Sequence, residues 1–81
     1  MFYVYLIKSN VTNKYYIGFT TDLKHRLESH NKGLNKATKS GIPWTLVYYE
    51  SYKDEHIARD RERKLKQYGN ALALLKRRLS L

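Results

Sequence analysis

Two stretches decide how this chain folds: Lys14-Tyr15-Tyr16-Ile17-Gly18-Phe19 and, upstream of it, Phe2-Tyr3-Val4-Tyr5-Leu6-Ile7. Both are dense in aromatic and β-branched residues, which favour strands. The residues between them, 8–13, are rich in turn formers. The two stretches together therefore predict a β-hairpin.

Side-chain alternation assigns each hairpin residue to one of two faces. One face is expected to carry Phe2, Val4 and Leu6 with Tyr15, Ile17 and Phe19. Tyr5 and Tyr16 then share the other face, with Gly18 two residues from Tyr16. A glycine inside a strand often marks a bulge or a place where another group approaches the backbone closely. We therefore expect a hollow beside the two phenols.

A helix is predicted after the hairpin. Thr21 or Asp22 can cap its start, and Asn31 with Gly33 supplies the stop. Residues three and four apart share a helix face, so Leu23 and Leu27 form the buried stripe. His30 lies nearly in line with that stripe, and Arg26 lies at its border.

The second half of the chain predicts a loop, a strand and two helices. Residues 34–43 have no sustained apolar period and are expected to form an exposed basic loop. The third strand is Trp44–Tyr52, and a helix follows through about Tyr68 with Ile57, Ala58, Leu65 and Tyr68 on its apolar side. Gly69-Asn70 is expected to break the chain before a last helix, from Ala71 to about Leu79, that carries Leu72, Leu75 and Leu79. The prediction is one α+β domain over residues 1–81, a small three-stranded antiparallel sheet flanked by helices.

Composition narrows the classes of partner. Sixteen Lys and Arg residues against seven Asp and Glu give a net charge of +9, which favours polyanions such as nucleic acid. No apolar run approaches the roughly 20 residues of a membrane span, and no signal pattern is present, so a cytoplasmic location is expected. The chain has no cysteine, which excludes disulfides and thiolate metal sites. The three histidines lack the spacing of a zinc site.

Tyr3-Val4-Tyr5 followed by Tyr16-Ile17-Gly18 resembles the paired signature of the GIY-YIG endonuclease superfamily. The whole chain is similar to the small stand-alone bacterial members of that superfamily. It departs from the name-giving motif at Tyr3, which stands in place of glycine, and at Val4, which stands in place of isoleucine. The resemblance implies a metal-dependent endonuclease that hydrolyses DNA phosphodiester bonds.

For Tyr5 and Tyr16 the resemblance implies that the two hydroxyls surround the attacking water and the scissile phosphate. One of them would act as general base after losing its proton to a neighbour. Which tyrosine does so stays open. By position alone both residues are ordinary half-buried strand aromatics that make a cross-strand contact.

Arg26 matches the helix-borne arginine of the superfamily, which implies a phosphate clamp that stabilises developing negative charge. Its alternative is an exposed ion pair with Asp22, four residues earlier. His30 lies one turn after Arg26, where the family pattern has a residue that hydrogen-bonds toward the tyrosines. By position alone His30 is a residue at a helix C-terminus, favoured there by the dipole.

Glu62 matches the glutamate on the corresponding helix of the superfamily, which implies a ligand for Mg²⁺ or Mn²⁺. One carboxylate suffices because Mg²⁺ keeps several waters and borrows ligands from substrate phosphate. The alternative role of Glu62 is a salt bridge to Lys66, four residues on. Asn70 suits a helix cap as well as an active-site amide.

Contacts to nucleic-acid phosphates are assigned to Lys32, Lys36, Lys39, Arg63 and Lys66. Asn31 and Thr38 are also expected to contact substrate. No base-reading helix is present, so selectivity for DNA structure, or weak selectivity, is expected in a repair or recombination role. Two alternatives remain: a nucleic-acid-binding module that cleaves little, and an interaction protein whose Leu72, Leu75 and Leu79 stripe docks a partner.

Overall fold

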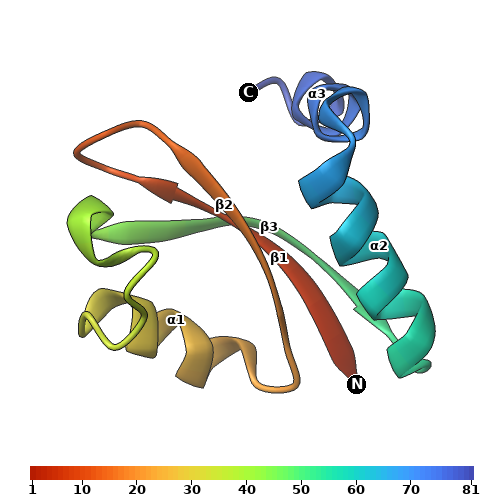
Figure 1. Ribbon diagram of the computed structural model, residues 1–81, viewed down its shortest axis with the longest axis horizontal. Helices are drawn as coiled ribbons and strands as arrows, with labels where there is room; N and C mark the ends of the chain where they lie inside the picture. Colours follow the sequence, from red (N-terminus) through yellow and green to blue (C-terminus); the bar gives the residue numbers. More distant parts are fainter.

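The structure is a computed structural model that describes all 81 residues (Figure 1). A hairpin is followed by a helix, a short 3-10 turn, a third strand and two more helices. In chain order the elements are β1 (Phe2–Ser9), β2 (Tyr15–Thr20), α1 (Leu23–Asn31), η1 (Lys39–Gly41), β3 (Trp44–Tyr52), α2 (Glu55–Gln67) and α3 (Gly69–Arg78). The α+β prediction is confirmed.

The three strands form one antiparallel sheet in the order β2-β1-β3. In the register of the hairpin Tyr5 lies opposite Gly18, and Ile7 lies opposite Tyr16. Tyr5 also pairs with Tyr49 of β3. The central strand β1 is therefore hydrogen-bonded on both edges, and Tyr5 lies in the middle of the sheet.

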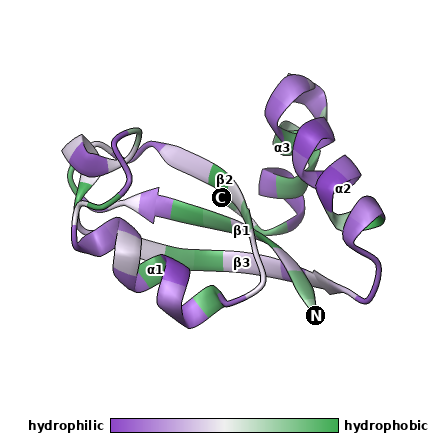
Figure 2. Ribbon diagram, turned by 60° about the horizontal axis from the view of Figure 1, so that its bottom comes forward, coloured by the Kyte–Doolittle hydropathy of each residue, from purple (hydrophilic) through white to green (hydrophobic).

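Helices cover both faces of the sheet, as Figure 1 shows, with α1 on one side and α2 and α3 on the other. On the α2 and α3 side the core consists of Val4, Leu6, Ile17, Ala58, Leu65 and Leu75. On the α1 side it consists of Tyr5, Ile7 and Trp44, with Leu23, Leu27 and Tyr16 packed against them. The predicted division of the hairpin between two faces is confirmed, and Figure 2 shows the hydrophobic residues concentrated in the strands between mostly hydrophilic helices.

The first helix follows its prediction closely. Asp22 is the N-cap, and its side chain accepts a hydrogen bond from the backbone N–H of His25. The helix ends at Asn31, and Gly33 takes a positive φ of 76° just beyond it. His30 is fully buried, so the apolar stripe of α1 continues into a histidine.

The predicted boundary between the last two helices is wrong by two residues. The break lies at Tyr68, whose extended backbone ends α2, and Gly69 and Asn70 form the first turn of α3. Ile57 and Tyr68 are about half exposed, at 53% and 51%, so they do not belong to the buried side of α2. After the bend at Tyr68, α3 packs beside α2, and Leu65 of α2 faces the core alongside Leu75 of α3.

The prediction of an exposed loop over residues 34–43 is also wrong in part. Thr38 is 1% exposed, and Gly41 lies against the ring of Trp44. The loop folds inward because its polar groups find partners under α1, which a hydropathy pattern does not reveal.

The leucine stripe of α3 is not free to dock a partner. Leu75 is buried in the core, and Leu72 and Leu79 pack against it. None of the helices is both long and apolar enough to cross a lipid bilayer.

Candidate active site

The candidate site is built around Tyr5, whose aromatic ring lies across the backbone of Gly18 on the neighbouring strand. A Cβ atom built at Gly18 would meet the Tyr5 ring, with Cε1 only 2.6 Å away. Glycine is required at this position because the tyrosine ring fills the space of a side chain. The predicted close approach at Gly18 is confirmed, but the expected hollow is occupied by Tyr5 itself.

A hydrogen-bond chain leads from Tyr5 into the interior. The Tyr5 hydroxyl lies 2.7 Å from Nε2 of His30. Nδ1 of the same ring lies 2.7 Å from the hydroxyl of Thr38, which in turn donates to the carbonyl of Asn35 at 3.3 Å. Tyr5 is 3% exposed, whereas His30 and Thr38 are 0% and 1% exposed, so the part of the chain behind Tyr5 is shielded from water.

Burial controls the protonation of this chain. Burial raises the pKa of the Tyr5 hydroxyl to about 12, although the charge of Arg26 opposes the rise. Burial also lowers the pKa of His30 below 6.5, with the Arg26 charge adding to the effect. At neutral pH the tyrosine therefore keeps its proton and the imidazole is uncharged.

Tyr16 completes an aromatic cluster on the same face. Its ring centroid lies 5.4 Å from that of His30 and 6.4 Å from that of Trp44, edge to face in both cases. Nζ of Lys66 lies 5.4 Å from the Tyr16 centroid. Tyr16 is only half-buried, so of the two tyrosines it is the one more open to solvent.

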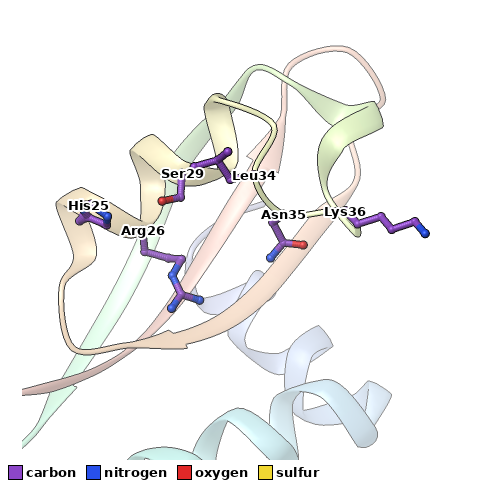
Figure 3. Close-up of a pocket in the computed structure, with 6 residues that line it drawn as sticks. All are labelled: His25, Arg26, Ser29, Leu34, Asn35 and Lys36. Carbon is purple, nitrogen blue, oxygen red and sulfur yellow. The ribbon is translucent and has the colours of Figure 1, made fainter.

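Arg26 projects from α1 into the largest cavity of the molecule, of about 500 Å³. Figure 3 shows its guanidinium and the Asn35 side chain directed into the same space. Five of the six lining residues are polar: His25, Arg26, Ser29, Asn35 and Lys36, with Leu34 as the sixth. No ion pair joins Arg26 to Asp22, whose carboxylate caps the helix instead. The guanidinium is thus available for an anion in the cavity.

Glu62 reaches the site from α2, which runs alongside the edge strand β2. Two contacts fix this placement: Arg59 lies over the Phe19 ring at 4.2 Å, and Lys66 lies beside Tyr16. Glu62 lies between Arg59 and Lys66 in sequence, and its charge helps to raise the Tyr5 pKa. Its carboxylate also accepts the predicted salt bridge from Lys66, at 3.1 Å.

The donor set around Glu62 is compatible with a weakly held divalent cation. The side chain of Glu62 is 20% exposed, and no group of three or more His, Asp or Glu side chains lies together anywhere in the structure. A single carboxylate suits Mg²⁺, which keeps most of its waters and takes further ligands from phosphate. Lys66 must release the carboxylate for this to occur.

The basic residues assigned to nucleic acid are divided by the fold. Lys36 lines the Arg26 cavity, and Lys66 lies beside Tyr16. Lys32 and Lys39 are exposed on the segment that follows α1. Arg63 instead binds Asp60 at 2.6 Å along α2, which leaves it a weaker candidate for phosphate.

Asn31 and Thr38 both have hydrogen-bond partners within the protein, although Asn31 is exposed and only Thr38 is buried. The Asn31 amide brackets the backbone of Trp44, accepting from its N–H at 2.6 Å and donating to its carbonyl at 3.0 Å. Thr38 holds His30. Sequence reasoning did not identify Thr38 as a partner of the histidine, because no local spacing links residues 30 and 38 across a loop.

Three comparisons place the chain among known proteins. A family model described as the GIY-YIG catalytic domain matches residues 1–78. The chain is 40% identical over 67 residues to a UPF0213 protein of Pediococcus pentosaceus, covering 82% of this chain and 70% of the relative. It is 38% identical over 72 residues to a UPF0213 protein of the archaeon Halobacterium salinarum, covering 88% and 92%. No solved structure gives a significant match.

Proposed function

Since the chain belongs to the GIY-YIG catalytic domain family, we propose that it is a nuclease that hydrolyses phosphodiester bonds in nucleic acid, DNA foremost, with a divalent cation. The observation that carries the proposal is the buried bond between Tyr5 and His30 beside the Arg26 cavity. A proton acceptor, His30, thus lies close to a cationic cavity that can receive a phosphate. A role in DNA repair or recombination is part of the same proposal.

The proton chemistry is assigned to Tyr5 and His30 together. With its pKa raised to about 12, Tyr5 is a poor source of free phenolate at neutral pH. A relay avoids that state: as water attacks phosphorus, its proton passes to the Tyr5 oxygen while the Tyr5 proton passes to Nε2 of His30. The neutral imidazole, 2.7 Å away, is the final acceptor.

Arg26 is assigned to the phosphate. Its guanidinium presents a planar fork of N–H donors that matches two phosphate oxygens. As the attack adds negative charge to those oxygens, a fixed cation stabilises the transition state more than the ground state. Lys36, on the wall of the same cavity, adds attraction for the adjoining backbone.

Glu62 is assigned to Mg²⁺ or Mn²⁺, which when bound would neutralise charge on the phosphate and its leaving oxygen. Tyr16 is assigned to the open side of the site, where its hydroxyl would orient the attacking water or the phosphate. Lys66 holds the carboxylate of Glu62 at 3.1 Å and thereby keeps the metal ligand near Tyr16 before substrate arrives.

The proposal is tested by cleavage of linear, flapped and branched DNA at low salt, with Mg²⁺, Mn²⁺ or chelator. Wild type is expected to cut only with metal, and Tyr5→Phe is expected to lose at least about a hundredfold in rate because the relay is broken. The matched control is Tyr49→Phe. Tyr49 is the exposed cross-strand partner of Tyr5 and should cut as wild type does.

Binding without cleavage is the second candidate function, and one observation favours it. The proposed metal ligand, Glu62, is already paired with Lys66. In the free protein its negative charge is therefore neutralised, and the surrounding surface is basic. This reading predicts salt-sensitive DNA binding that chelator does not change, with no cutting of any substrate in the panel.

A further inference from the structure

The hydrogen-bond chain behind Tyr5 continues past His30 to a residue that the proposed reaction does not itself require. Nδ1 of His30 lies 2.7 Å from Oγ1 of Thr38, and Thr38 is 1% exposed. A neutral imidazole has one N–H donor and one bare nitrogen, and its partners decide which nitrogen carries the hydrogen. Thr38 therefore decides which atom donates in each hydrogen bond between Tyr5, His30 and Thr38.

A count of the donor hydrogens allows only one arrangement of these hydrogen bonds. Thr38 donates its only hydroxyl hydrogen to the carbonyl of Asn35, which cannot donate in return. The Thr38 oxygen is then left as the acceptor for an N–H at Nδ1, and Nε2 is left bare to accept from Tyr5. In the opposite arrangement the Tyr5 hydrogen has no acceptor in the protein, since Arg26 beside the hydroxyl can only donate and His30 is its one possible acceptor. Burying an unsatisfied hydroxyl is costly.

Thr38 is itself held in place from the other side. Its backbone carbonyl accepts a 2.7 Å hydrogen bond from the indole N–H of Trp44. The Trp44 backbone is in turn bracketed by Asn31, the residue that follows His30. Hydrogen bonds thus link the end of α1, the loop over residues 34–43 and the start of β3 beside the His30 ring.

We infer that Thr38 is a positioning residue that keeps the His30 hydrogen on Nδ1, so that Nε2 faces Tyr5 as a proton acceptor. The inference rests on the proposed nuclease function for its consequence. What it states is a property of the free protein: His30 populates one tautomer, and the Thr38 hydroxyl selects that tautomer. A wrong tautomer would point an N–H at Tyr5 and leave the relay without an acceptor.

The first test reads the tautomer directly by NMR of the protein labelled with ¹⁵N at histidine, at neutral pH without DNA or metal. His30 is expected to show a protonated Nδ1 and a bare Nε2. A protonated Nε2 in wild type would overturn the inference whether or not the protein cuts DNA. Failure of the nuclease proposal would appear in the cleavage panel alone and would leave this spectrum unchanged.

The second test uses Thr38→Val, which keeps the shape of the side chain but removes the hydroxyl. The His30 spectrum is expected to move toward the other tautomer or a mixture, with cleavage lowered by at least about tenfold. Thr38→Ser should restore both the spectrum and most of the rate. Thr45→Val, at an exposed threonine of β3, is the control for loss of a hydroxyl elsewhere.

An unchanged tautomer in Thr38→Val would overturn the inference, as would a rate lost equally in Thr38→Val and Thr38→Ser. If Thr38→Val does not fold, the wild-type spectrum and the serine variant still decide the outcome, because each reports the state of the ring in a folded chain.

Discussion

At position 18 the absent side chain is as important as any side chain that is present. The Tyr5 ring lies where a Cβ of residue 18 would stand, and this seats the hydroxyl against His30. A sequence pattern indicates that something approaches the glycine, but only the register of the strands shows that the neighbour is Tyr5. The glycine and the tyrosine act as one unit.

Gly18→Ala is therefore expected to be destabilising out of proportion to one methyl group. The new methyl must displace the Tyr5 ring, and overpacking of this kind typically costs about 1–3 kcal/mol. Chemical denaturation measures the free energy of unfolding, and the alanine variant should also lose the tyrosine–histidine bond. Gly69→Ala is the control, because nothing lies within 4 Å of a Cβ at residue 69. Equal stability of the two variants would contradict the account.

The raised pKa of Tyr5 predicts how stability depends on alkaline pH. Burial favours the neutral phenol in the folded state, so its pKa is about 12 against 10.0 in the unfolded chain. Stability from this group is present in full below pH 10 and is lost as pH rises through 12, by up to about 3 kcal/mol. The stability difference between wild type and Tyr5→Phe should therefore shrink between pH 10 and 12. A difference that stays constant with pH would contradict the buried, proton-holding tyrosine.

At the scale of elements, the setting of α2 decides where Glu62 lies. Arg61, the residue before it, makes two 2.9 Å bonds to Glu50 of β3. Tyr48 and Tyr52 donate to the same carboxylate. Burial would raise the pKa of Glu50, but these four bonds outweigh it and hold the pKa below its ordinary value. We regard this cluster as the clamp that fixes the rotation of α2.

Glu50→Gln is expected to destabilise the fold by about 2 kcal/mol, because it removes the charge that Arg61 pairs with in a partly buried place. Cleavage should fall as well, since α2 carries Glu62. Asp60→Asn breaks only exposed pairs, with Arg63 and Lys64, and should change stability by less than about 1 kcal/mol. Denaturation of both variants checks the prediction, and a larger effect at Asp60 than at Glu50 would refute the clamp.

The elements show where sequence reasoning succeeds and where it stops. Strand periodicity and the Asp22 cap give β1, β2 and α1 correctly, because these signals are local. The start of α3 was misplaced because a glycine followed by asparagine suggests a break, whereas here the extended Tyr68 makes the turn. The burial of Thr38 was missed because its partners lie 6 and 8 residues away, across a loop.

The same limit applies to the candidate site. Tyr5, Tyr16, Arg26, His30 and Glu62 can be nominated from the family motif, and the fold brings the last four near Tyr5 or its partner His30. Their grouping depends on how α2 lies against β2, which is a matter of tertiary packing. The ion pair of Glu62 with Lys66 was foreseeable from spacing alone.

At the scale of the whole molecule, a net charge of +9 on 81 residues governs the encounter with nucleic acid. Affinity of such a protein falls with salt because binding releases counterions, with a slope of about 0.9 per phosphate contacted in duplex DNA. Lys36 lines the cavity that holds Arg26, whereas Lys64 is paired with Asp60 on α2.

Lys36→Gln is expected to reduce the slope of log affinity against log salt concentration by about 0.9, the value of one phosphate contact. Lys64→Gln should leave that slope nearly unchanged. Fluorescence anisotropy across a salt series gives both slopes, with Tyr5→Phe, which is expected to cut little, as the background protein. Equal slopes for the two variants would show that phosphate does not use the Arg26 cavity.

The most direct test of the account is metal-dependent DNA cleavage by Glu62→Gln beside Glu55→Gln, with binding measured on the same preparations. Both changes remove one carboxylate charge from α2, but Glu55 pairs with Arg59 on the exposed surface. We expect Glu62→Gln to bind DNA but no longer to cut it with Mg²⁺ or Mn²⁺, while Glu55→Gln does both. Cutting by Glu62→Gln at the wild-type rate would contradict a single active centre formed by Glu62, Arg26 and the Tyr5–His30 pair.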